Sequence, residues 1–174
     1  MSWLRSHPAF FVRCAEVVPS PCCGEQFKII GSRERICKQA TGESIILIVR
    51  RLRCLNCRRI HHELPDCLVP YKRYESTCVE HVISNEVEAS TIAADDTTLY
   101  RWRNWFQQQK TYLLGCLIAI NARFHSHPVE VTSIPSESAH HRIGQFVGDG
   151  AGWLARVVRP LANFNLWLHT RSAF

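Results

Sequence analysis

Two cysteine-containing corners constrain the fold of this chain more than any other feature. One is the C-x-x-C knuckle from Cys54 to Cys57, and the other is the upstream run Cys22-Cys23-Gly24. A zinc ribbon brings two such corners together with a β-hairpin, so that thiolates surround one ion. The sequence therefore predicts a hairpin between the corners and a structural metal site where its open end closes.

The amino-terminal corner departs from the usual Cys-Pro-x-Cys-Gly pattern, because Ser20 stands where the first ligand belongs. On that register Cys23 supplies the third thiolate. Four side chains compete for the fourth position: Cys22, Cys14, His61 and His62. Zinc is the expected ion, since it is borderline soft and accepts tetrahedral sulfur. The predicted ligands are Cys22, Cys23, Cys54 and Cys57.

The alternative interpretation is that these thiols are small apolar side chains in a metal-free fold. Nine cysteines are an odd number, and the amino terminus lacks the layout of a secretory signal. Thiols and metal are therefore expected in place of disulfides. The longest apolar run, 112–120, is too short to span a membrane, which favours a cytoplasmic protein. The cysteines without knuckle spacing are expected to be ordinary thiols: Cys37, Cys67, Cys78 and Cys116.

Positive charge is concentrated on the predicted ribbon. The chain carries a formal charge of +6 and a sequence pI near 9.0, with nine of its basic residues between Lys28 and Arg59 against two acids. This imbalance favours a polyanionic partner such as nucleic acid. The arginines expected to hold phosphates are Arg50, Arg51, Arg53, Arg58 and Arg59.

The chain is predicted to be α+β, with a small zinc-ribbon-like β-hairpin domain followed by a mostly helical domain. β-branched runs at 27–30 and 45–49 favour strands. Helices are expected at about 74–88, 88–94, 97–110, 111–124, 138–147 and 151–168, with irregular structure from His61 onward. The expected domains are 1–69 (ribbon with a lead-in segment), 70–124 (helix-turn-helix) and 125–174 (a helical extension packing on the middle domain).

The segment 97–110 is predicted to be the recognition helix of a helix-turn-helix, capped by Asp96. Leu99, Trp102 and Phe106 fall on one face and should be buried. The opposite face carries side chains that hydrogen-bond phosphates and base edges: Thr97, Thr98, Arg101, Asn104 and Gln108. The alternative is a solvated polar face on a structural helix.

The chain resembles a family of uncharacterised bacterial proteins, defined by a domain of unknown function and associated with mobile elements. The resemblance is carried by residues 48–66, 68–74 and 168–174. More loosely, a ribbon followed by a helix-turn-helix is similar to the amino-terminal region of some insertion-sequence transposases, which binds the ends of the element. The resemblance implies DNA binding and a role as an accessory or regulatory factor, since the chain is too short for a nuclease domain.

These features predict a sequence-specific double-stranded DNA-binding protein, with a homodimer or a mobile-element protein as a possible further partner. The nearest rival is RNA binding, with exposed tyrosines stacking unpaired bases. Another is a protein-interaction module scaffolded by zinc. An enzyme is not expected, because the histidine groups have no carboxylate at a matching spacing: His125, His127, His140 and His141, with Asp149.

Overall fold

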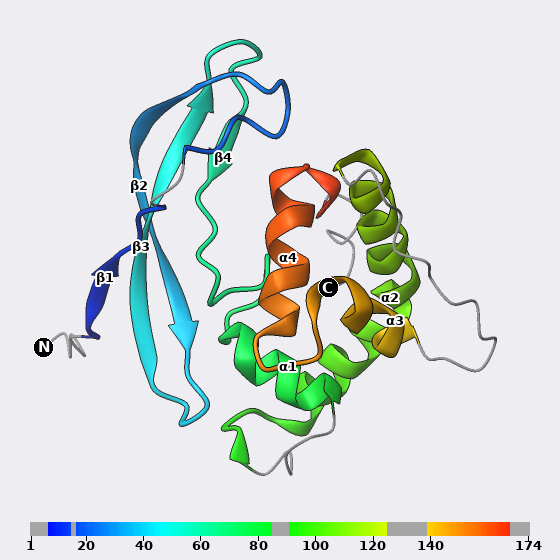
Figure 1. Ribbon diagram of the computed structural model, residues 1–174. Coiled ribbons are helices and arrows are strands. Elements are labelled where there is room, and N and C mark those ends of the chain that lie inside the picture. Colours follow the sequence, from blue (N-terminus) through cyan, green and yellow to red (C-terminus); the bar gives the residue numbers. More distant parts are fainter. Residues whose placement is uncertain (1–6, 15–16, 85–90, 125–138, 168–174) are drawn as a thin grey trace, which may run out of the picture.

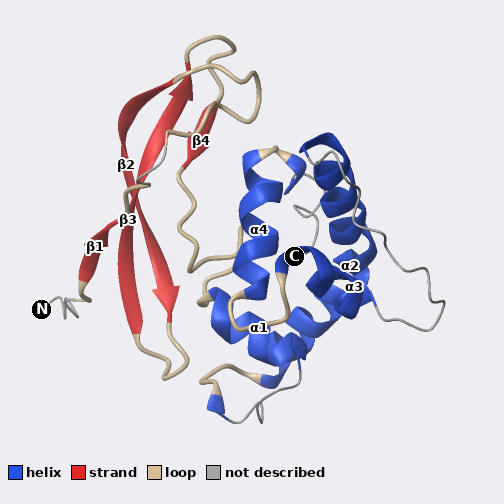
Figure 2. Cartoon of the chain, viewed as in Figure 1, coloured by secondary structure: helices blue, strands red, loops and turns tan. Residues whose placement is uncertain are grey.

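The computed structural model describes residues 7–14, 17–84, 91–124 and 139–167. A four-stranded sheet is followed by four helices, which confirms the α+β prediction (Figures 1 and 2). The strands are β1 Ala9–Phe11, β2 Phe27–Lys38, β3 Ser44–Cys54 and β4 Ile60–His62. The helices are α1 Ser76–Ser84, α2 Asp96–Phe124, α3 Ala139–Val147 and α4 Trp153–Asn163.

The predicted hairpin is the centre of the sheet. β2 and β3 pair antiparallel from Lys38↔Ser44 at the turn to Phe27↔Cys54 at the open end. A register shift next to Gly31, whose φ is 136°, lets the long ribbon bend where other residues would be strained. The hairpin therefore returns Cys54 beside the start of β2, next to the amino-terminal cysteine corner.

Both strands of the hairpin are longer than the apolar runs that predicted them. β2 continues to Lys38 because it pairs with β3 as far as Ser44, beyond the apolar run that predicted it. Two short strands were not expected. β1 adds to β3 in parallel, and β4 pairs with β3 from Arg53↔Ile60 to Arg51↔His62. The prediction of irregular structure from His61 was therefore wrong at His61 and His62, whereas residues 63–66 form no helix or strand, as predicted.

The helices differ from the prediction mainly in their ends. α1 begins at Ser76, and α2 is one uninterrupted helix where two helices were expected, because nothing near Lys110 breaks it. The helix α2 is also capped one residue earlier than predicted. Asp95 accepts hydrogen bonds from the backbone N–H of Thr98 (2.8 Å) and from its hydroxyl (2.9 Å).

The helix-turn-helix prediction is not confirmed. A helix was expected at about 88–94, but residues 91–95 form no α-helical turn, and 85–90 lie outside the described residues. α1 and α2 do pack against each other. The connection between Ser84 and Asp96 is longer than the tight turn that joins the two helices of such a motif.

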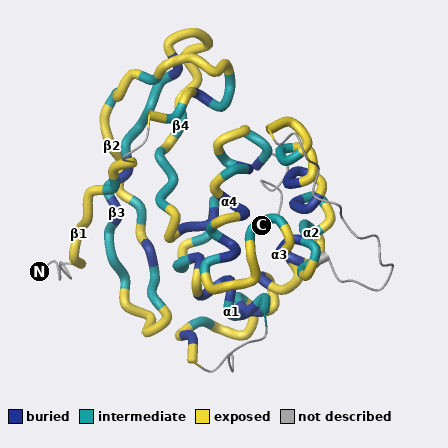
Figure 3. The backbone as a smooth tube through the Cα atoms, in the orientation of Figure 1, coloured by how far each residue is buried: buried dark blue, intermediate teal, exposed yellow. Residues whose placement is uncertain are grey.

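Each part of the molecule has its own core. The helical unit, Ser76–Asn163, buries a cluster centred on Trp102, Phe106 and Trp153. The sheet unit, Ala9–His62, has only a small cluster in which Cys37, Leu47 and Val49 pack with Leu68. Figure 3 shows buried backbone gathered mainly in the helices.

Backbone hydrogen bonds join the two units at the end of β2. The N–H of Lys38 donates to the carbonyl of Arg73 (2.7 Å), and the N–H of Glu75 donates to the carbonyl of Lys38 (3.0 Å). Figure 1 shows α1 and α4 on the side of the helical unit that faces the sheet. A cavity of about 790 Å³ lies between the sheet and α4, with Leu52 and Val158 among the residues that line it.

The amino terminus of α4 is held by a buried carboxylate from α1. Glu80 is 2% exposed, and its two oxygens accept the backbone N–H groups of Gly152 (2.7 Å) and Leu154 (2.9 Å). The N–H groups of a first helical turn have no partner within the helix, so this carboxylate supplies one. Glu80 thereby ties α4 to α1.

No helix among the described residues is both long enough and apolar enough to cross a membrane.

Candidate metal centre

The two cysteine corners have the same backbone geometry. In the first, the N–H groups of Cys23 (3.3 Å) and Gly24 (2.8 Å) donate to the carbonyl of Ser20. In the second, the N–H of Arg58 donates to the carbonyl of Cys54 (3.2 Å). Each turn then places its next residue in the left-handed region, Gly24 at φ 74° and Arg58 at φ 63°.

This correspondence aligns the corners residue by residue. Ser20 matches Cys54, Cys23 matches Cys57, and Gly24 matches Arg58. Ser20 therefore occupies the position of a missing thiolate, as the sequence pattern predicted. Ser20 is 2% exposed, and its hydroxyl oxygen lies 3.3 Å from the Sγ atom of Cys54.

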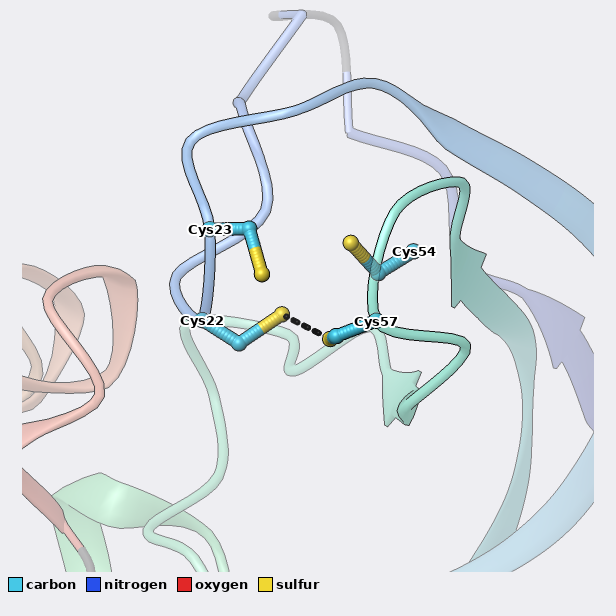
Figure 4. A group of neighbouring side chains, drawn as sticks. All are labelled: Cys22, Cys23, Cys54 and Cys57. Atoms are coloured by element: carbon cyan, nitrogen blue, oxygen red, sulfur yellow. Dashed lines mark hydrogen bonds between the residues drawn. The ribbon is translucent and has the colours of Figure 1, made fainter.

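Four thiols converge between the corners, and they are the four predicted ligands: Cys22, Cys23, Cys54 and Cys57 (Figure 4). Their Sγ atoms all lie within 4.8 Å of one another, and those of Cys22 and Cys57 are 3.3 Å apart. Cys22 is the side chain that takes the place left by Ser20. It reaches the cluster from one position before Cys23.

The donor set fits a metal ion. Thiolates bound tetrahedrally at about 2.3 Å from zinc would have their sulfur atoms about 3.8 Å apart. The observed spread of up to 4.8 Å needs only small side-chain movements to reach that arrangement. The cluster can therefore bind a metal ion with four sulfur ligands.

Hydrogen bonds favour a thiolate at Cys54. The hydrogen bond with the Ser20 hydroxyl lowers the pKa of Cys54 the most. Burial raises this pKa, and the backbone N–H groups of Cys57 and Asn56 lower it again, so that the net pKa is about 6. The neighbouring thiols behave differently. Hydrogen bonding with Cys57 raises the pKa of Cys23 to about 12, and burial raises that of Cys22. Without an ion, the cluster therefore holds its negative charge mainly on Cys54.

The alternative fourth ligands lie outside the four-sulfur cluster. His61 is the nearest, with its Nε2 atom 3.2 Å from the Sγ of Cys22, and its ring packs against Phe27. Burial, and then the charge of Arg59, lower the pKa of His61, so its ring is neutral at neutral pH. His61 is thus placed to hydrogen-bond Cys22 from outside the cluster. Cys14 instead donates its backbone N–H to Glu63 (2.6 Å).

The predicted phosphate-binding arginines lie partly on the two faces of β3 and partly in the knuckle loop. Arg50 is paired with Glu63, whose oxygens lie 2.6 and 2.7 Å from its guanidinium. Arg51 and Arg53 alternate with it and point to the opposite face of β3. Arg58 and Arg59 are exposed in the knuckle loop beside the cysteines.

The predicted base-contacting residues occupy one polar side of α2. Leu99, Trp102 and Phe106 are buried, as expected from their spacing. Thr97, Arg101, Asn104 and Gln108 are exposed, while Thr98 is half-buried and bound to Asp95. The side-chain amide of Gln108 donates to that of Asn104 at 3.4 Å.

The histidines weighed for catalysis do not form a metal-ligand group within the described residues. The ring of His140 packs against those of Phe106 and Trp153, at centroid distances of 5.8 and 4.7 Å. Its neighbour His141 is exposed on α3. His125 and His127 lie outside the described residues.

Residues that the site prediction did not include form a second basic region, opposite Arg50 on the sheet. Arg33 and Arg35 lie two apart on β2, opposite Val49 and Leu47. They share a face with Arg51 and with His62 of β4. The two arginines two residues apart, Arg33 and Arg35, were the available signal, but the strand was predicted to end before them.

Comparison with known families covers part of the chain, from the first cysteine corner to the start of α2. Residues 20–102 match the model of a family described as a domain of unknown function (DUF6431). The match includes both cysteine corners, β2 to β4, α1 and the start of α2. No curated protein and no solved structure matches the chain significantly. The likeness to transposase DNA-binding regions therefore stays a prediction.

Proposed function

We propose that this protein binds double-stranded DNA in a sequence-specific way and that a structural zinc ion holds its sheet unit together. The observation that carries the proposal is the arrangement of cations around the cysteine cluster. Arg51, Arg53, Arg58 and Arg59 lie on or beside the metal-closed end of the hairpin, and none of them forms an ion pair with another described residue.

Zinc is the proposed ion because of the ligand chemistry. Four thiolates suit zinc, which needs no redox change and has no preferred geometry beyond the tetrahedron. Three of the four cysteines are partly or fully exposed, so the ion would lie near the surface with the knuckle arginines around it. In this role the metal supports folding and takes no part in chemistry.

The arginines would supply affinity and α2 would supply specificity. Guanidinium groups on the knuckle can pair with phosphates in any sequence, and binding should weaken steeply with salt as counterions are released. The exposed side of α2 presents Arg101 and Asn104, which suit guanine and adenine edges in a major groove. This division of roles keeps α2 as the base-reading element without requiring a tight turn before it.

The test is selection of bound duplexes from a random pool with the zinc-loaded protein, with zinc quantified in the same sample. An enriched motif and about one zinc per chain are expected. Arg101→Ala and Asn104→Ala should each cost about 1–3 kcal/mol on the selected site and little on random duplex. Arg58→Ala should weaken binding to the selected site and to random duplex equally. It should also reduce the slope of log affinity against log salt concentration by about one.

Arg50→Ala is the matched control, because Arg50 belongs to the same arginine-rich strand but is paired with Glu63. It should leave the salt slope unchanged. The proposal fails if no motif is enriched from a zinc-loaded sample, or if folded RNA competes with duplex DNA at lower concentrations than the DNA itself. A zinc-loaded protein that binds neither nucleic acid would indicate a protein-interaction module.

A further inference from the structure

A groove rich in positive charge lies between the sheet and the segment that leads into the helical unit. Its volume is about 610 Å³, and its walls come from β2, β3 and β4 on one side and from residues 70–73 and the end of α4 on the other. We call it the basic groove, after the residues that carry its charge and its exposed ring: Arg33, Arg35, His62, Tyr71, Lys72 and Arg73.

Cations outnumber acids among the residues that line this groove. Arg33 and Arg73 are exposed, and neither forms an ion pair with another described residue. Glu34 is the one acid among the lining residues, against Arg33, Arg35, Lys72 and Arg73. Burial, followed by the charges of Arg33 and Arg51, lowers the pKa of His62, as expected where cations crowd.

Two of the cations are already held in position. The guanidinium of Arg35 donates to the carbonyl of Lys72 (2.9 Å) and more weakly to that of Val69 (3.4 Å), so Arg35 fixes the opposite wall of the groove. The Lys72 ammonium lies 4.7 Å from the centroid of the Trp105 ring. Arg35 and Lys72 therefore fix the shape of the groove and add positive charge to it, and Arg33 and Arg73 are its exposed cations.

Tyr71 adds an aromatic surface to the same wall. Its side chain is 53% exposed, and its backbone lies in the left-handed region at φ 65°. That conformation costs a bulky residue free energy, and such strain is often kept where a side chain must be presented. The strained backbone presents an exposed ring at the wall of the groove.

We infer that the basic groove binds one strand of single-stranded nucleic acid, with its phosphates on Arg33 and Arg73 and an unpaired base against the ring of Tyr71. Proteins that bind single strands combine a positively charged groove with aromatic stacking in this way. A volume of about 610 Å³ lies within the range of small-ligand pockets and cannot enclose a duplex. Arg58 and Arg59 of the knuckle and the exposed side of α2 do not line this groove, although Arg51 lies on the same face of the sheet.

The experiment titrates the zinc-loaded protein with a fluorescent oligothymidylate and, separately, with random duplex DNA. Arg33→Ala combined with Arg73→Ala should weaken oligothymidylate binding at least tenfold and duplex binding less than twofold. Tyr71→Ala should weaken oligothymidylate binding about tenfold, whereas Tyr71→Phe should match the wild type because stacking needs only the ring.

A control matched in charge comes from two exposed arginines outside the groove, Arg13 and Arg123. Replacing both with alanine removes the same net charge and should leave oligothymidylate binding within twofold. The inference is wrong if the wild type does not bind oligothymidylate, or if both double variants weaken it equally. A wild-type protein that binds oligothymidylate but not duplex DNA would overturn the proposed function and leave this inference standing.

Discussion

The sheet unit and the helical unit reach stability by different means. Within the described residues, the buried cluster of the helical unit has twenty members, including Trp102, Trp105 and Trp153 and, from outside Ser76–Asn163, Val69 and Trp167. The cluster of the sheet unit has four. A core of four residues, one of them Leu68 from outside the strands, is too small to hold a long hairpin by apolar burial alone. The cysteine cluster at its open end is the feature that can supply the rest.

The proposed metal site accounts for where the charge is placed. A unit held by its core must bury much of its surface, but a unit closed by a metal can leave both faces of its sheet to other groups. One face of the hairpin carries Arg33, Arg35 and Arg51, and the other carries the Arg50–Glu63 pair. The comparison therefore predicts that the two units respond differently to the loss of the metal.

The largest effect is expected from Cys57→Ser or from treatment with a strong chelator. Structural zinc contributes on the order of 10 kcal/mol in small zinc domains, more than a four-residue core can replace. The sheet unit should lose its protection against hydrogen exchange and become sensitive to protease, while the helices keep theirs. Hydrogen exchange followed by mass spectrometry separates the two units in one experiment.

Cys116→Ser is the matched control, since Cys116 is a buried thiol of the helical unit outside the cluster. It should leave zinc content unchanged. Equal loss of protection in both units on metal removal would show that they fold as one cooperative body. Unchanged protection in the sheet unit would show that the four thiols are not a structural metal site.

The next effect concerns the unusual amino-terminal corner. Cys22→Ser should lower zinc affinity by at least a hundredfold, because it removes one of four thiolates. Adding Ser20→Cys to it should restore most of the loss, since Ser20 occupies the position equivalent to Cys54. Competition with a chromophoric chelator measures both affinities.

The order of these two affinities tests the residue alignment of the corners. If Ser20→Cys did not restore binding to Cys22→Ser, the corners would not be equivalent and His61, beside Cys22, would be the next candidate for the fourth position. Ser20→Ala serves as the comparison that removes the hydroxyl without adding a ligand. It should raise the pKa of Cys54, whose thiolate the hydroxyl stabilises.

The cysteine site could be predicted because the signals for it lie in short stretches of sequence. Knuckle spacing and the glycine at Gly24 predict two tight turns, and a β-branched run between them predicts the hairpin that joins them. The sequence left the fourth ligand open between Cys22 and three alternatives, because Ser20 stands where that ligand usually lies. Only the three-dimensional turn shows that a side chain one residue before Cys23 reaches the same space.

The features that were missed depend on contacts between distant segments. β1 and β4 are three residues each, too short for a periodic signal, and they form because β3 offers unpaired edges. The buried Glu80 reads as a surface residue in the sequence, because its partners in α4 are more than seventy residues away. Side-chain faces of α2 were predicted well because a period of 3.6 residues needs no partner.

Within the helical unit, the largest single effect is expected at Glu80. Glu80→Ala removes both acceptors from the first turn of α4, and a charged hydrogen bond contributes about 1.5–3 kcal/mol. We expect a loss of about 3 kcal/mol in the unfolding free energy of the helical unit. Urea unfolding followed by tryptophan fluorescence measures it, since Trp153 lies in the same turn.

Glu80→Gln keeps the shape and one oxygen acceptor, so it should lose less stability than Glu80→Ala. Zinc content should stay unchanged in both variants, because α1 and α4 contribute nothing to the cysteine cluster. If Glu80→Ala also released the metal, the stabilities of the two units would be coupled through their shared backbone hydrogen bonds.

The smallest expected effect is a gain in stability at Arg58→Gly. Arg58 holds φ 63° at the position where the other corner has Gly24, and the left-handed region costs a residue with a Cβ about 1–2 kcal/mol. Part of the gain is offset by the greater freedom of glycine in the unfolded chain, about 0.5–1 kcal/mol, so the net gain should be below about 1 kcal/mol. Arg58→Ala keeps the Cβ and should show no gain in stability.

Both variants should weaken duplex binding equally, because each removes the same guanidinium. Chemical unfolding of the zinc-loaded variants, read beside their duplex affinities, checks both halves. A gain in stability together with a loss of binding would mean that the second corner retains a strained arginine for the charge it presents. Unchanged binding would remove Arg58 from the phosphate contacts and leave its strain without a function.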